Sequence, residues 1–80
     1  MNMIIEASWR VPDSIPTVLG QPHSGVIYYE VDTMPNDDKV VAHLQTFIRH
    51  LDPFSVRVEK SHRTAEDLVG RGMAFYKNAL

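Results

Sequence analysis

Hydrophobic and polar residues alternate with a period of two in three stretches, which predicts strands at residues 3–11, 25–32 and 54–59. One face of the first predicted strand is entirely apolar and comprises Ile5, Ala7, Trp9 and Val11. Its other face comprises Ile4, Glu6, Ser8 and Arg10. The second stretch is partly apolar on both faces. In the third stretch Phe54, Val56 and Val58 alternate with polar residues and are expected to be buried.

Two further stretches carry the spacing of amphipathic helices. The first begins at Asn36, a suitable N-cap, ends before Pro53, and has the apolar stripe Val40, Val41, Leu44, Phe47, Ile48 and Leu51. The second follows Thr64, which forms a capping-box pattern with Asp67, and has the stripe Ala65, Leu68, Val69, Gly72, Phe75, Tyr76 and Ala79. We expect Gly72 on this stripe to permit close packing of the helix, and Gly70 to mark a kink or a docking place.

The element order β-β-α-β-α predicts a two-layer α+β sandwich, a three-stranded mixed sheet with two helices on one face. A right-handed crossover through the first helix makes strands 25–32 and 54–59 parallel. Strand 3–11 then pairs antiparallel with one or both, and a position between them is one option. The long connection 13–25 is expected to fold against the edge of the core, with a turn closed by Gly20.

Composition narrows the classes of protein to consider. Eighty residues form a single domain, residues 1–80, and a net charge of -2 offers no general attraction for a polyanion. Cysteine is absent, which excludes disulfides, thiolate catalysis and cysteine-ligated metals. The chain shows no signal-peptide pattern and no segment of about 18 apolar residues. These features together predict a cytoplasmic protein.

Residues that carry chemistry do not form a known catalytic or cofactor pattern. His43 and His50 lie seven residues apart on a helix, a separation of about 10 Å that is too long for one metal ion. Asp37 and Asp38 are the adjacent carboxylates, and they complement the start of the first helix. The sequence has no nucleophile elbow, phosphate-binding loop or dinucleotide fingerprint. We therefore expect no metal, no cofactor and no enzymatic activity.

The sheet face away from the helices is the predicted functional surface, because aromatic residues and arginine are enriched in interface centres. The basic residues beside the second helix, Lys60, His62, Arg63 and Arg71, are expected to add to this surface. The predicted contact residues are Ile4, Arg10, Val26, Tyr28, Arg57, Lys60, His62, Arg63 and Arg71.

The leading hypothesis is a small protein-binding module: a regulator, inhibitor or accessory subunit that occupies a larger partner protein, of a kind often encoded by phages or plasmids. Self-association as a homodimer through the same face is a second option, and the third strand is a candidate edge for strand addition. The alternative is a nucleic-acid-binding protein that uses Arg10, Tyr28, Arg57 and the cluster at residues 60–63. The negative net charge counts against this alternative.

Overall fold

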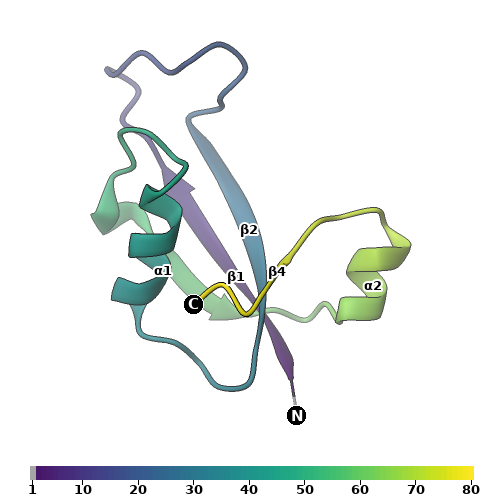
Figure 1. Ribbon diagram of the computed structural model, residues 1–80. Coiled ribbons are helices and arrows are strands. Elements are labelled where there is room, and N and C mark those ends of the chain that lie inside the picture. The colour runs from purple at the N-terminus through teal and green to yellow at the C-terminus, as the bar shows by residue number, and fades with distance from the viewer. Residues whose placement is uncertain (1) are drawn as a thin grey trace.

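The computed structural model describes residues 2–80, which form a mixed four-stranded sheet with the order β3-β1-β2-β4 (Figure 1). The strands are β1 (Met3–Arg10), β2 (Ser24–Val31), β3 (Arg57–Lys60) and β4 (Tyr76–Lys77). β1 pairs antiparallel with both β2 and β3. The α+β class, the parallel direction of β2 and β3, and the position of β1 between them are therefore confirmed.

The main core lies between the odd-numbered face of β1 and helix α1 (Asp37–Gln45). This cluster consists of Ile5, Ala7, Trp9, Val11, Tyr29, Val40, Leu44, Ile48, Leu51 and Val56. At its edge Gly25 lies against the indole of Trp9, so that a Cβ atom on Gly25 would be 2.7 Å from Trp9 Cζ2. The alternation in β1 thus predicts which face is buried, because successive side chains of a strand point to opposite faces.

The first helix is shorter than its apolar stripe. α1 ends at Gln45, the Thr46 hydroxyl donates a hydrogen bond to the His43 carbonyl at 2.6 Å, and His50 adopts a left-handed φ of 63°. Ile48 and Leu51 are nevertheless buried, because the turn after the helix returns them to the core. Asn36 occupies the N-cap position, although its side chain makes no capping hydrogen bond.

The predicted start of the third strand is wrong. Residues Pro53–Ser55 form the 3-10 turn η1, in which the Asp52 carboxylate accepts a hydrogen bond from the Phe54 N–H at 3.0 Å. This local bond turns the chain before β3 begins at Arg57. Phe54, predicted to be buried, is 87% exposed.

The second helix is also shorter than predicted, and a fourth strand follows it. α2 (Ala65–Gly70) ends in a Schellman motif, in which Gly72 N–H binds the Val69 carbonyl at 3.0 Å and Met73 N–H binds the Leu68 carbonyl at 2.9 Å. Gly72 has a φ of +69° and no atom within 4 Å of the position of a Cβ. The predicted packing role of Gly72 is therefore wrong, since its backbone conformation explains the glycine.

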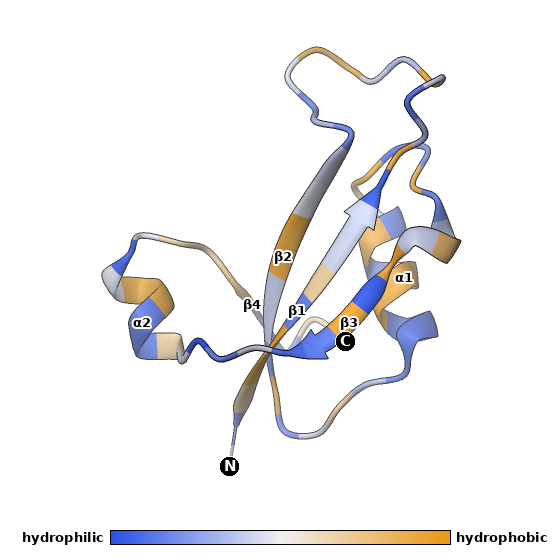
Figure 2. Ribbon diagram, turned by 180° about the vertical axis from the view of Figure 1, so that it is seen from behind, coloured by the Kyte–Doolittle hydropathy of each residue, from blue (hydrophilic) through white to orange (hydrophobic). Residues whose placement is uncertain are grey.

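The two helices do not share one face of the sheet, which corrects the predicted layering. Ile4 and Leu68 are both buried, yet neither belongs to the core cluster under α1. Figures 1 and 2 show α1 and α2 on opposite sides of the strands. The cause is local: Ser61 N–H binds the Ile4 carbonyl at 2.9 Å, and the chain then passes over the even-numbered end of β1.

The β1–β2 connection is closed at its base by a hydrogen bond from Val11 N–H to the His23 carbonyl at 2.7 Å. Its tip turns at Gly20, which has a φ of +85°, and exposes Val18 and Leu19. No helix among residues 2–80 has the length and apolar character needed to cross a membrane.

Candidate protein-binding surface

The segment around α2 divides the even-numbered face of the sheet into a covered half and an uncovered half. In the pairing register Ser8 lies between Val26 of β2 and Arg57 of β3. Arg10 follows two residues later on the same face of β1. We call these four residues, Ser8, Arg10, Val26 and Arg57, the open half-face. In Figure 2, which views the molecule from behind, α2 lies beyond one side of the strands and leaves the ends of β1 and β2 beside the β1–β2 connection uncovered.

Two large apolar side chains are exposed on or beside the open half-face. Val26 is 51% exposed at its centre, and Phe54 is 87% exposed on the adjoining turn η1. The Arg57 guanidinium lies beside η1, because its Nη1 donates to the carbonyls of Phe54 at 2.9 Å and Val56 at 3.0 Å. The arginine is thereby held in place beside the exposed phenylalanine.

Arg10 gives the open half-face a second positive charge. Its Nη2 lies 3.8 Å from Oδ2 of Asp13, and both side chains are largely exposed. An exposed pair at this distance contributes little to stability. Its main chain is fixed more firmly, since Arg10 N–H binds the Ser55 hydroxyl at 2.9 Å. The end of β1 is thus held rigidly while the guanidinium remains available.

Ile4 and Tyr28 belong to the covered half. Ile4 is 4% exposed, so its predicted contact with a partner is wrong: the segment that leads into α2 buries it. Tyr28 is half-buried beside the guanidinium of Arg63. Hydrogen bonding to Tyr28, and then to Asp67, raises the pKa of Arg63. This arginine is therefore part of the packing on Tyr28.

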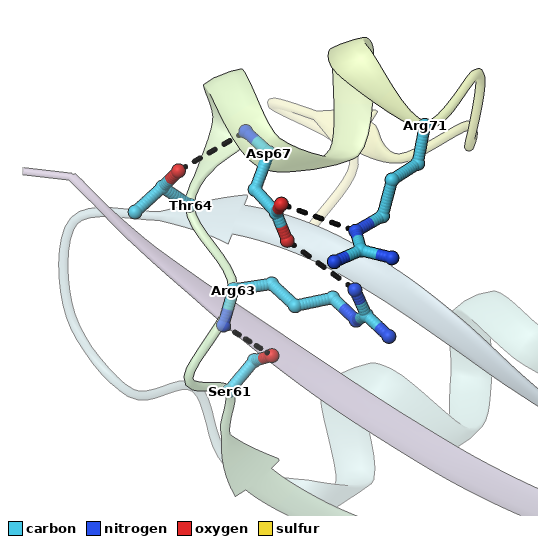
Figure 3. A network of polar contacts seen from close by, with 5 residues as sticks. All are labelled: Ser61, Arg63, Thr64, Asp67 and Arg71. Atoms are coloured by element: carbon cyan, nitrogen blue, oxygen red, sulfur yellow. Dashed lines mark hydrogen bonds and ion pairs between the residues drawn. The ribbon is translucent and has the colours of Figure 1, made fainter.

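Arg63 and Arg71 are not free cations, because both bind the carboxylate of Asp67 (Figure 3). Arg63 Nη1 lies 3.3 Å from Oδ2, and Arg71 Nε lies 3.1 Å from Oδ1. The hydrogen bond from Arg71 is the largest influence that lowers the pKa of Asp67. The predicted N-cap is confirmed, since the Thr64 hydroxyl accepts a hydrogen bond from Asp67 N–H at 3.1 Å. Arg63, Asp67 and Arg71 thus form an ion-pair network within the chain.

Lys60 and His62 lie apart from the open half-face. Lys60 pairs with Ile5, which places it on the face of the sheet opposite to Arg57. His62 is exposed and lines a shallow cleft of about 650 Å³ together with Lys60 and Arg63. The acidic residues Glu30 and Glu66 line the same cleft and offset these charges. The structure therefore brings the predicted contact residues together in two places. Arg10, Val26 and Arg57 share the open half-face, whereas Lys60, His62 and Arg63 line the cleft beside α2.

An aromatic cluster, absent from the predicted site, joins the C-terminal strand to α1. The Tyr29 hydroxyl and His43 Nδ1 are 2.7 Å apart, and the ring of Tyr76 stacks on Tyr29 at a centroid distance of 5.6 Å. Phe47 packs edge-on against His43 at 5.3 Å. Burial, and then the neighbouring Tyr76, raises the pKa of Tyr29 to about 12. The cluster was not predicted because Tyr76 was assigned to the second helix. Its contacts hold β4 against the edge of β2.

Potential metal ligands do not form a cluster in the part of the chain that the structure describes. No three His, Cys, Asp or Glu side chains in this range lie close enough to hold a metal ion. No protein-family model, curated protein or solved structure matches the chain. The open half-face and the neighbouring Phe54 therefore form the candidate binding surface.

Proposed function

We propose that this chain is a small protein-binding module that acts as a regulator, inhibitor or accessory subunit by occupying a larger partner protein. The observation that supports the proposal is the exposure of Val26 and Phe54 beside Arg10 and Arg57. Exposed apolar side chains with a polar rim are typical of interaction sites. Aromatic residues and arginine are enriched among those that dominate binding energy.

The charges on this surface indicate the kind of partner. Arg57 is held by carbonyl groups of its own turn, and Arg10 has a single weak acidic neighbour. A partner that presents an apolar patch flanked by carboxylates would therefore complement the open half-face. Burial of Phe54 would remove a large aromatic surface from water, and charge-assisted hydrogen bonds to the arginines would fix the orientation.

Capture of a partner from a lysate of the source organism tests the proposal when wild type is compared with surface variants. Val26→Glu places a charge at the centre of the open half-face, and Phe54→Ser removes the aromatic ring. Val69→Glu is the matched control, because Val69 is also exposed, at 68%, and lies on α2. Both site variants are expected to lose the captured protein by roughly 30-fold or more, a loss typical of residues at the centre of an interface.

Two outcomes would contradict the proposal. Equal capture by wild type, Val26→Glu and Phe54→Ser would show that the open half-face is not the contact surface. Capture that disappears after nuclease treatment of the lysate would indicate nucleic-acid binding instead. Circular dichroism of each variant verifies that a loss of capture does not reflect unfolding.

A further inference from the structure

We infer that the outer edge of β3 pairs with β3 of a second copy of this chain, antiparallel and with the two-fold axis at Val58. The inference goes beyond the proposed function and does not depend on it. β3 is a terminal strand of the sheet, so one of its sides faces no other strand among residues 2–80. Unpaired strand edges of this kind are sites of association.

The direction of the main-chain groups on this edge follows from a hydrogen bond next to it. Ser61 N–H points toward β1, since it binds the Ile4 carbonyl at 2.9 Å. Main-chain groups of successive residues in a strand point to alternate sides. The N–H and C=O groups of Glu59 and Arg57 therefore also point toward β1. Val58 and Lys60 therefore direct their N–H and C=O groups outward, toward a second chain.

The charges of β3 select one register among those that align these outward groups. A two-fold axis at Arg57, Glu59 or Lys60 would place each of these residues opposite its own copy, and like charges directly opposite one another destabilise a sheet. A two-fold axis at Val58 instead places Arg57 opposite Glu59 of the second copy, and Glu59 opposite Arg57. In this register the two Val58 residues exchange both of their main-chain hydrogen bonds.

The same register relieves an unfavourable pair within the single chain. Glu6 and Glu59 lie directly opposite each other on β1 and β3. No basic residue among residues 2–80 forms an ion pair with either carboxylate. Pairing at Val58 brings Arg57 of the second copy next to Glu59. Arg57 Nη1 is held by the Phe54 and Val56 carbonyls, and the guanidinium has further N–H groups to bind the carboxylate.

Sedimentation equilibrium of the purified full chain tests this pairing, with charge reversals as the perturbation. The wild-type mass is expected to rise with concentration from 9.1 kDa toward twice that value. Arg57→Glu and Glu59→Arg are each expected to lose this association, since each places like charges opposite one another. Mixing the two variants restores opposite charges at both positions, so the mixture is expected to regain a heterodimer.

The controls separate the interface from the stability of the fold. Glu66→Arg reverses an exposed charge on α2 and is expected to dimerise as the wild type does. Glu59→Arg removes the repulsion from Glu6, so its thermal stability at low concentration is not expected to fall. A wild-type mass that stays at 9.1 kDa up to about 1 mM would overturn the inference. A dimer that persists in both single variants, or a mixture that stays monomeric, would also overturn it.

Discussion

Two glycines at the end of α2 allow one substitution to be compared in two backbone conformations. Gly70 is the last residue of the helix, whereas Gly72 has a φ of +69° and closes the Schellman motif. Neither has an atom within 4 Å of the position of a Cβ. Substitution by alanine therefore meets no steric obstacle at either site, and the difference between the two variants reports the backbone conformation alone.

The expected effects have opposite signs. Gly70→Ala lowers the entropy of the unfolded chain and favours the helix, which stabilises the protein by roughly 0.5–1 kcal/mol. Gly72→Ala forces an L-residue into the left-handed region, which costs about 1–2 kcal/mol. In a domain of this size, 1 kcal/mol shifts the Tm by about 4–8 °C. Gly70→Ala is therefore expected to raise the Tm, and Gly72→Ala to lower it.

Thermal unfolding followed by far-UV circular dichroism measures both variants under one set of conditions. The double variant Gly70→Ala/Gly72→Ala completes the comparison and is expected to fall near the sum of the single effects. Equal shifts for the two single variants would refute the reasoning, since they would show that the conformation at Gly72 carries no special cost. Leu68 of α2 is fully buried, so we expect unfolding of α2 to be coupled to unfolding of the whole domain.

Two further expectations concern the core. Gly25→Ala places a methyl group 2.7 Å from Trp9 Cζ2 and is expected to destabilise the protein by about 1–3 kcal/mol. The near-UV circular dichroism signal of Trp9, the single tryptophan, is expected to change as well. Unchanged stability would show that Gly25 and Trp9 are not closely packed. Tyr29 has a pKa of about 12 in the folded chain against 10.0 in the unfolded chain, so its contribution to stability is complete below pH 10 and is lost as the pH rises toward 12. Two pKa units correspond to at most about 2.7 kcal/mol, and solvent near the hydroxyl reduces this value. Denaturant titrations between pH 9 and 12 should show a steeper loss for wild type than for Tyr29→Phe, and parallel curves would refute the assignment.

The first two strands were predictable, because alternation along β1 records which of its faces is buried and β2 is rich in β-branched and aromatic residues. The apolar side chains of β1 at Ile5, Ala7 and Trp9 lie in the core, as their spacing predicts. The parallel direction of β2 and β3 followed from the helical connection between them, since parallel strands are usually joined by a crossover that contains a helix. These predictions depend on local or general rules, and the structure confirms them.

The ends of both helices were not predictable from spacing. Ile48 and Leu51 continue the stripe of α1 by position, but they reach the core from a turn. Tyr76 continues the stripe of α2 in the same way, although it lies in β4 beyond a glycine with positive φ. Periodicity shows which apolar residues would share a helix face if the helix continued. Where the helix ends depends instead on single hydrogen bonds and backbone dihedral angles.

The candidate surface was predictable only in part, because coverage of the sheet depends on where α2 lies. Arg10, Val26 and Arg57 were correctly assigned to one face by alternation. Ile4 shares that face but is buried by the chain that leads into α2. Phe54 was assigned to the core because it extends the alternation of β3, and a hydrogen bond to Asp52 turns it outward instead.

The proposed dimer and the proposed partner surface are geometrically compatible. Antiparallel pairing preserves the face on which each side chain lies, so the two copies of Ser8 and Val26 would lie on the same side of one continuous sheet. Two open half-faces on one side form a bivalent surface, which increases the apparent affinity for a partner with two sites or for a repetitive assembly. Arg57 would contribute to both contacts, through its salt bridge to Glu59 of the second copy and through its position beside Phe54. Dimerisation would therefore strengthen partner binding without any additional contact to the partner.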